Sequence, residues 1–418
     1  MTDVVRAPGG FPVVGVIGGG QLARMCQPPA VALGVQLSIL AENDKASAAL
    51  VVPSSPVGDH GDLAAVREFA RHCDVVTFDH EQVPTEVLAA LEADGVVLQP
   101  SPQALVFAQD KLRMRRRLSE LGVPCPRWAQ VTTREEVLAF GEEVGWPLIV
   151  KAPRGGYDGK GVLVAGGIEE VDPWLSEVAR DRATVAEQAG GVGASGSPSV
   201  PAFADGLLVE EKVDFVRELA VLVARSPSGQ ATAWPVVETV QVGGVCAEVL
   251  APAPDLTEEV ALAATRDALR IAGELGVTGV LAVEMFEVPA TSGRGGSRCV
   301  VNELAMRPHN SGHWTIEGSV TSQFEQHLRA VLDLPLGDPR PRSRWTVMGN
   351  VLGGDYSELY STYRHLLARD PGLRVHFYGK EVRPGRKVGH VTVCGEDLAD
   401  LRERARHATE FVTGVITG

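Results

Sequence analysis

Three polar side chains lie inside two apolar segments and have the types that bind a divalent cation. Glu284 interrupts the apolar run 280–288. The adjacent residues Asn302 and Glu303 interrupt the run 299–304. Because an unpaired carboxylate is costly to bury, two carboxylates and an amide facing one cleft would suit Mg²⁺, with nucleotide phosphates as further ligands. The pattern favours a metal site at Glu284 and Glu303; the alternative is that each acid pairs with a nearby arginine.

A glycine-rich loop follows a lysine at the end of a predicted strand. The segment 151–161 contains four glycines around Tyr157 and Asp158. Such a loop can fold over phosphates, whose charge its amide groups and Lys151 would oppose. It is not a P-loop, because G-x-x-x-x-G-K-[ST] is absent. The alternative is a solvated hairpin with ordinary turn glycines, which this glycine density disfavours.

A cluster of cations lies near the C-terminus of an acidic chain. The segment 380–390 carries Lys380, Arg383, Arg386 and Lys387, whereas the whole chain has a net charge of −14. Like charges repel, so such a cluster typically binds an anion, and forked arginine contacts suit a phosphate. A solvated basic turn is the alternative, but the acidic background favours a phosphate site.

Two further segments carry polar groups beside these motifs. The loop 307–314 directly follows the second metal-site segment, and its density of polar residues predicts a substrate platform, although His313 could be structural. At 210–213, two glutamates, a lysine and a valine end a predicted strand. Their backbone could meet an adenine edge and their acids a ribose, but chemistry alone favours an exposed strand end.

A glycine-rich turn also occurs near the N-terminus. Residues 18–23 fit G-x-G-x-x-A between a predicted strand and a predicted helix, with Glu42 about 20 residues further on, as in dinucleotide-binding folds. The signal is weak, because a simple tight turn explains it as well. It keeps open an NAD-dependent oxidoreductase as an alternative function.

The elements that position these motifs are readable from periodicity. Strand and helix patterns alternate from residue 13 to residue 98, which implies a parallel, doubly wound sheet. A basic helix is predicted at 109–121, and the two metal-site segments form a predicted β-hairpin. The segment 189–201 is rich in Gly, Ser and Pro, which predicts a flexible surface insertion.

Composition narrows the class of protein. A chain of 418 residues predicts two or three domains, and 44% hydrophobic residues suffice for real cores. The net charge of −14 argues against nucleic-acid or anionic-membrane partners. The six cysteines form no C-x-x-C pair and no stretch is long enough to span a bilayer, so we expect a cytoplasmic protein.

Four stretches together resemble the N5-carboxyaminoimidazole ribonucleotide synthetases, a family of ATP-grasp ligases. They are GGGQLARM, GGYDGKG, NELAMRPHNSGHW and KEVRPGRKVGH, and the resemblance extends over nearly the whole chain. It implies an α/β (α+β) chain with an ATP-grasp fold, an N-terminal Rossmann-like domain and a small C-terminal mixed domain. The implied boundaries are 1–105, 106–345 and 346–418, with a mobile subdomain at about 150–215.

The resemblance also implies residue roles. It assigns ATP to Lys111, Lys151, Gly156, Gly159, Glu210, Glu211, Val213, Glu218, Asn302 and Glu303. It assigns Mg²⁺ to Glu284 and Glu303. It assigns the aminoimidazole ribonucleotide and bicarbonate to Tyr157, Asp158, Arg307, His309, Asn310, Lys380, Arg386 and Lys387. The implied catalytic residues are Tyr157, Lys160, His309 and Lys380.

The implied reaction has two steps. Bicarbonate attacks the γ-phosphate of ATP to give carboxyphosphate and ADP, and the exocyclic amine of the ribonucleotide then traps carboxyphosphate or its CO₂. Such enzymes are typically homodimers. This chain departs from the family pattern at Lys111, Lys160 and Met306. The nearest alternative is an ATP-grasp ligase acting on another amine, which would leave the basic turn at 380–390 without a phosphate to bind.

Overall fold

The N-terminal part of the chain is built on a small parallel sheet. The computed structural model describes residues 6–156, 161–190, 202–289, 296–354 and 358–416. The strand order is β2-β1-β3, with all pairs parallel. The elements are β1 (Val13–Ile17), α1 (Gln21–Leu33), β2 (Gln36–Leu40), α2 (Leu63–Ala70), β3 (Val75–Phe78) and α3 (Thr85–Ala93). The predicted parallel sheet is confirmed, but the strand expected at 96–98 is reduced to a single bridge between Leu98 and Val76.

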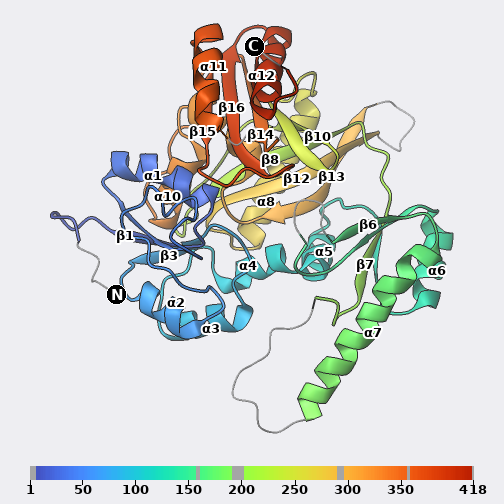
Figure 1. Ribbon diagram of the computed structural model, residues 1–418. Helices are drawn as coiled ribbons and strands as arrows, with labels where there is room; N and C mark the ends of the chain where they lie inside the picture. Colours follow the sequence, from blue (N-terminus) through green and yellow to red (C-terminus); the bar gives the residue numbers. More distant parts are fainter. Residues whose placement is uncertain (1–5, 157–160, 191–201, 290–295, 355–357, 417–418) are drawn as a thin grey trace.

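A second, four-stranded sheet follows two short helices. The strand order is β4-β7-β5-β6, with all pairs antiparallel. The elements are α4 (Pro102–Gln109), α5 (Lys111–Glu120), β4 (Trp128–Val131), α6 (Arg134–Val144), β5 (Leu148–Lys151), β6 (Val162–Ala165), α7 (Ile168–Gly190) and β7 (Leu207–Glu211). Helices α6 and α7 pack on this sheet and enclose a separate apolar core (Figure 1). The predicted insertion at 189–201 begins in the last turn of α7, and the rest of it lies outside the described residues.

The largest sheet has nine strands and reaches into the C-terminal part of the chain. The order is β13-β12-β8-β10-β11-β14-β16-β15, and β9 pairs with β8. Its strands are β8 (Arg217–Arg225), β9 (Ala231–Ala233), β10 (Val237–Val242), β11 (Val245–Ala251), β12 (Gly279–Pro289), β13 (Ser297–Ala305), β14 (Trp345–Leu352), β15 (Arg374–Phe377) and β16 (Lys387–Gly395). Because β11 pairs with β14, the C-terminal module shares one continuous sheet with the segment before it.

Helices cover this sheet and connect it to the N-terminal part. They are α8 (Glu258–Glu274), η1 (Asn310–Gly312), α9 (Thr315–Gly318), α10 (Gln323–Val331), η2 (Leu359–Thr362), α11 (Tyr363–Arg369) and α12 (Leu398–Thr413). Helix α10 packs against β12 and β8 and also against α1, so it holds the parallel sheet beside the large one (Figure 1). Helix α12 packs on β14 and β16.

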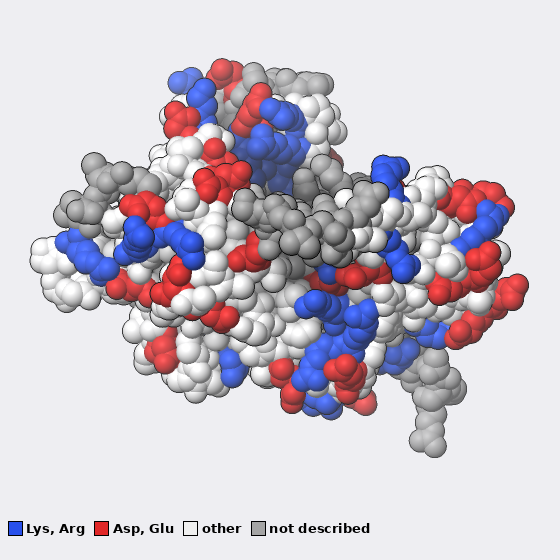
Figure 2. Space-filling model, turned by 90° about the horizontal axis from the view of Figure 1, so that it is seen from below, with Lys and Arg blue, Asp and Glu red and all other residues white. Residues whose placement is uncertain are grey.

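Charge is mixed over the surface. Figure 2 shows acidic and basic side chains interspersed on the face seen from below, with Lys and Arg gathered in one hollow. The negative net charge therefore does not spread over that face as a single acidic surface. Within the described part of the chain, no helix has the length and apolar character needed to cross a bilayer.

Candidate active site

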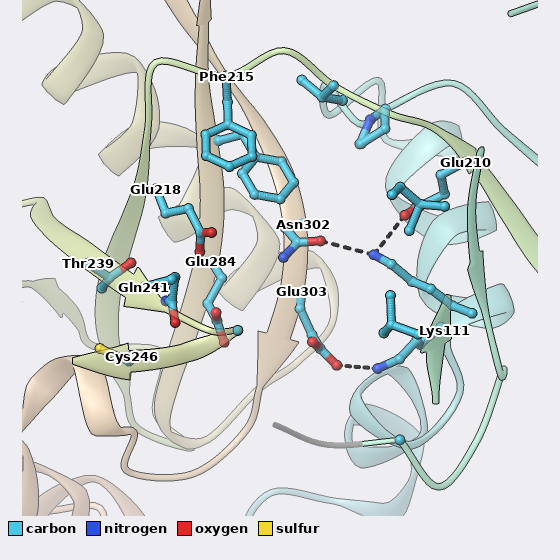
Figure 3. A pocket seen from close by; sticks show the side chains of 18 of the residues that line it. Lys111, Glu210, Phe215, Glu218, Thr239, Gln241, Cys246, Glu284, Asn302 and Glu303 are labelled. Carbon is cyan, nitrogen blue, oxygen red and sulfur yellow. Dashed lines mark hydrogen bonds and ion pairs between the residues drawn. The ribbon is translucent and has the colours of Figure 1, made fainter. Parts of the chain in front are cut away.

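A cavity of about 430 Å³ lies between the four-stranded sheet and the nine-stranded sheet. Its walls come from β5, β6 and β7 on one side and from β8, β10, β12 and β13 on the other, as Figure 3 shows for the labelled side chains. The predicted residues that line it are Lys111, Lys151, Gly156, Glu210, Glu211, Val213, Glu218, Glu284, Asn302, Glu303, His309, Asn310 and Lys387. Segments separated by up to 276 positions (111 to 387) therefore meet in one place.

A β-bulge aims the hairpin residues into this cavity. In the antiparallel pair β12–β13, Glu284 lies opposite Glu303 and Met285 lies opposite Val301, so Asn302 is an extra residue in β13. A regular strand would send two consecutive side chains to opposite faces, whereas a bulge can re-aim one of them. Asn302 and Glu303 consequently both face the cavity beside Glu284 (Figure 3). The predicted hairpin is confirmed, and its bulge explains how adjacent residues share one site.

Lysine contacts connect the two sides of the cavity: Lys151 of the four-stranded sheet reaches Asn302 of the nine-stranded sheet, and Lys111 of α5 reaches Glu303. Lys151 Nζ lies 2.7 Å from Glu210 Oε2 and donates to Asn302 Oδ1 at 3.0 Å. Lys111 pairs with Glu303. Burial alone would raise the pKa of Glu210, but the charges of Arg115 and Lys151 outweigh it and lower the pKa to about 2. Glu210 is therefore a permanent anion that holds Lys151 in place.

Helix α5 also anchors the start of the glycine-rich loop. Asp110 caps this helix by accepting from the backbone N–H of Arg113, and its other oxygen accepts from Arg154 at 2.6 Å. The backbone N–H of Lys111 donates to the carbonyl of Pro153. Gly156 lines the cavity, so the loop starts at its edge. Tyr157, Asp158, Gly159 and Lys160 lie outside the described residues.

The two carboxylates of the β12–β13 hairpin, Glu284 and Glu303, have pKa values that shift in opposite directions. Burial, followed by the charges of Glu303 and Glu218, raises the pKa of Glu284 to about 7. Burial also acts on Glu303, but Lys111 and Lys151 lower its pKa. Among the described residues, Glu303 pairs with Lys111 and Glu284 lies 3.3 Å from His309 Nε2, and neither acid forms an ion pair with an arginine. This favours the metal site over acid–arginine pairs.

This set of oxygens fits Mg²⁺ bound together with a nucleotide. The described residues contain no group of three or more His, Cys, Asp or Glu side chains arranged to hold a metal unaided. Mg²⁺ typically takes one or two protein carboxylates and completes its octahedron with phosphate oxygens and water. A bound Mg²⁺ would add positive charge to that of Lys111 and would therefore reduce the repulsion between the carboxylates of Glu284 and Glu303.

The loop after β13 forms a further part of the cavity wall, next to Glu284. Burial, then the charges of Arg307 and Lys387, lowers the pKa of His309 to about 3, so this imidazole is neutral at physiological pH. Asn310 and Asn350 exchange two amide hydrogen bonds, of 2.9 and 2.7 Å. Gln323 accepts from the backbone N–H of His309 and donates to its carbonyl. The loop is thus held rigidly from β14 and α10.

Gln323 also bears on whether His313 binds substrate or is structural, which the sequence left open. Because the oxygen of Gln323 accepts from His309, its amide nitrogen must be the donor toward His313 Nδ1, 3.0 Å away. Burial, together with nearby cationic groups, keeps the pKa of His313 well below its usual value. His313 is therefore a neutral, buried histidine that supports the loop from behind.

The basic turn at 380–390 reaches toward the N-terminal domain. Lys380 donates to Gln21 of the first glycine-rich turn and lies 5.8 Å from the ring centre of Tyr378. Arg386 is exposed and donates to the carbonyl of Glu381 at 3.3 Å. Lys387 lines the cavity, whereas Lys380 and Arg386 lie outside its wall. A phosphate role for all three stays a prediction.

Two acids after β3, which were missed in the sequence, lie beside predicted site residues. Glu81 pairs with Arg307 at 2.7 Å and fixes its guanidinium. Asp79 is partly buried and accepts from the backbone N–H of Ala23 at 2.8 Å; loss of water around its carboxyl group raises its pKa to about 6. Their position in the sequence could have indicated them, because both directly follow a buried parallel strand, and ligand-binding polar residues gather at the carboxyl ends of such strands.

The first glycine-rich turn is satisfied within the protein. The backbone N–H of Gly19 points to Glu42, and Asp79 takes a donor of the first turn of α1. A Cβ on Gly20 would come within 1.9 Å of Asp79 Oδ2, so glycine is required there for close packing. The protein's own carboxylates thus use donors that a dinucleotide pyrophosphate would need. This favours the structural turn over the NAD alternative.

Two antiparallel sheets that face each other across a cleft of lysines and acids define an ATP-grasp enzyme, an ATP-dependent ligase. Residues 116–324 match the ATP-grasp domain, 12–109 the ribonucleotide synthetase preATP-grasp domain, and 346–404 the phosphoribosylaminoimidazole carboxylase C-terminal domain.

The chain belongs to the N5-carboxyaminoimidazole ribonucleotide synthase family. It is 51% identical to the family member of Mycobacterium tuberculosis, over 96% of this chain and 88% of the relative. The crystal structure of the Thermus thermophilus synthetase matches with a TM-score of 0.79 at 34% identity, over 97% of this chain and 99% of the other. The Aspergillus clavatus synthase, solved with ADP and 5-aminoimidazole ribonucleotide, matches with a TM-score of 0.80 at 30% identity, over 97% and 99% of the two chains.

Proposed function

We propose that this cavity carries out the reaction after which the family is named. The protein carboxylates 5-aminoimidazole ribonucleotide to N5-carboxyaminoimidazole ribonucleotide at the expense of ATP, in purine biosynthesis. One observation carries the assignment of the site. The paired lysines and hairpin acids that suit a nucleotide share a single cavity with His309, Asn310 and Lys387.

The nucleotide would lie in the cavity between the four-stranded sheet and the nine-stranded sheet. Phe215 and Phe286 stack with ring centres 4.6 Å apart at this wall, and Val213 adds apolar surface beside them, which suits an adenine. Glu218 faces the same space and is positioned for ribose hydroxyls. Lys111 and Lys151 would oppose the phosphate charge, and Gly156 lines the cavity beside them.

Glu284 and Glu303, with Asn302 beside them, would hold Mg²⁺. The ion, when bound, neutralises charge on the phosphate oxygens. The protein itself contributes by holding the side-chain oxygens of Glu284, Asn302 and Glu303 in place through the β-bulge. It also keeps water away from the labile carboxyphosphate.

Bicarbonate and the ribonucleotide would enter from the side of the loop 307–314. Bicarbonate attacks the γ-phosphate to give carboxyphosphate and ADP, and the amine of the ribonucleotide then takes up the carboxyl group as inorganic phosphate and a proton leave. Nδ1 of neutral His309 accepts from the backbone N–H of Ser311, so its Nε2–H can donate a hydrogen bond there, and Arg307, held by Glu81, supplies a fixed positive charge. Tyr157, Asp158 and Lys160 are proposed partners in this step, and Lys380, Arg386 and Lys387 are proposed to bind the ribonucleotide phosphate. We further propose a homodimer, as is typical of the family.

The decisive experiment is ADP release measured with a set of candidate amines, with and without bicarbonate. ADP release should require 5-aminoimidazole ribonucleotide, bicarbonate and Mg²⁺ together. Equal turnover with another amine, or turnover with the ribonucleotide that does not depend on bicarbonate, would refute the proposal.

A further inference from the structure

One arginine of helix α5 is completely buried beneath the nucleotide side of the cavity. Arg115 has 0% exposure, whereas Arg113 and Arg116 of the same helix are exposed. A buried guanidinium is costly unless its charge and donors are matched. Arg115 does not line the cavity, so its role must be exerted through the residues that it contacts.

The guanidinium of Arg115 connects two walls of the site. Its Nε lies 2.5 Å from Glu210 Oε1 on β7, and its Nη2 donates to the carbonyl of Asn302 at 2.7 Å. Its Nη1 approaches the sulfur of Cys125 at 3.9 Å. One side chain therefore grips both the anion that holds Lys151 and the backbone of the β13 bulge.

The two oxygens of Glu210 divide its charge between two cations. Oε1 pairs with Arg115 and Oε2 with Lys151. If Lys151 turns toward a phosphate, its contact with Glu210 weakens, and a buried carboxylate without a cation is strongly destabilised. Arg115 remains in place as the second cation, so it removes most of this cost. Without Arg115, Glu210 would instead retain Lys151.

We propose that Arg115 is a positioning residue that makes Lys151 available to the nucleotide by balancing the charge of Glu210, and that it also fixes the bulge presenting Asn302 and Glu303. This inference rests on the proposed nucleotide role of Lys151. It predicts that Arg115 governs nucleotide affinity without contacting the nucleotide.

The first test compares Arg115→Met with Arg116→Met. Arg116 is exposed and bonds to Gln130 outside the cavity, so it controls for loss of an arginine from this helix. Loss of a charge-assisted contact predicts a rise of about tenfold to a hundredfold in the KM for ATP and in the Kd for ADP measured by calorimetry. The KM for the ribonucleotide should stay within about twofold, because Arg115 acts on the nucleotide wall.

The second test asks whether charge balance is the cause. In Arg115→Met/Glu210→Gln the buried anion is gone and Lys151 is released, so the Kd for ADP should be several-fold lower than in Arg115→Met, without reaching wild type because Glu210 itself lines the cavity. Arg115→Lys, which keeps the charge, should also stay close to wild type. Neither recovery is expected if Arg115 only fills space.

Three results would overturn the inference. These are a Kd for ADP in Arg115→Met equal to that of Arg116→Met, a double variant no better than Arg115→Met, or an Arg115→Lys variant as weak as Arg115→Met. If Arg115→Met does not fold, the double variant and Arg115→Lys still decide the question, because neither leaves Glu210 as an unbalanced buried charge. Calorimetry with ADP needs no turnover, so failure of the wild-type protein to carboxylate the ribonucleotide would refute the proposed function separately.

Discussion

The nucleotide wall and the C-terminal basic turn both carry several charges, yet they hold them in opposite ways. On the nucleotide wall, the side chains of Lys111 and Lys151 are 10% exposed and Glu210 is 2% exposed; Lys151 pairs with Glu210 of the same sheet, and Lys111 pairs with Glu303, which is 40% exposed, across the cleft. In the basic turn, Arg383 and Glu381 pair while 66% and 67% exposed. Buried charges interact strongly in a low dielectric, whereas exposed pairs are screened by water and salt. Substitutions should therefore be coupled on the nucleotide wall and nearly independent in the turn.

The largest effect is expected at the hairpin acids. Glu303→Gln removes a proposed Mg²⁺ ligand and leaves Lys111 without its anion, so ATP turnover should fall by about a thousandfold or more while the fold persists. ADP release measures ATP turnover, and far-UV circular dichroism shows whether the fold persists. Glu274→Gln, an exposed acid paired with Arg117, is the control. Turnover at the wild-type level in Glu303→Gln would remove the metal assignment.

A smaller loss is expected where a neutral network supports the ribonucleotide side. Asn350→Ala removes both amide bonds to Asn310, which should lower kcat/KM for the ribonucleotide by about tenfold. The KM for ATP should change less, because Asn350 bonds to Asn310 and to the carbonyl of Cys246 and not to the lysines of the nucleotide wall. An equal rise in both KM values would show that the two sides are not separate.

In the basic turn, single charges should act one at a time. Arg386→Ala should raise the KM for the ribonucleotide by about fivefold to tenfold with kcat little changed, and the difference should shrink as salt is added. Arg383→Ala is the matched control, since Arg383 already pairs with Glu381 at the surface. An unchanged KM in Arg386→Ala would exclude Arg386 from the phosphate site.

The smallest expected effect is on stability, and it comes from the carboxyl group of Asp79, which lies near Lys380 of the basic turn. Burial raises the pKa of Asp79 from 3.8 to about 6, so the folded state favours its protonated form. Its contribution to the free energy of unfolding is fully present below about pH 4 and is lost as the pH rises through about 6, on the order of 1 to 3 kcal/mol in total.

Asp79→Asn cannot titrate and should lack this loss. The stability of wild type relative to Asp79→Asn should therefore decrease between about pH 4 and pH 6 and remain constant above. Urea unfolding of both proteins across this range measures the difference. A gap between the two proteins that does not vary with pH would show that Asp79 has an ordinary pKa.

Much of the site was predictable because its residues interrupt apolar patterns. Glu284 and Glu303 stand out in buried strands, and both line the cavity. Arg115 was hidden among the cations of a basic helix, where only packing distinguishes the buried arginine from its exposed neighbours. Gln323 and Asn350 carried no signal, since a lone amide in a helix or strand is ordinary until its partners are known.

The two glycine-rich turns were similar in sequence, and their surroundings separate them. The turn at Gly18 meets the carboxylates of Glu42 and Asp79, whereas the loop that begins after Lys151 opens on the cavity. Which acceptors face a glycine turn depends on residues distant in the chain.

By itself, the sequence determined the alternation of strands and helices in the N-terminal part, the polar groups set within apolar runs, and the four motifs that identify the family, because these depend on neighbouring residues and on local periodicity. The tertiary structure decided the bulge that turns Asn302 and Glu303 to one side, the pairing of β11 with β14 that extends the large sheet, and the partners of each buried charge. These features depend on contacts between distant segments and on the removal of water around charges, and neither is encoded in the residues taken one stretch at a time.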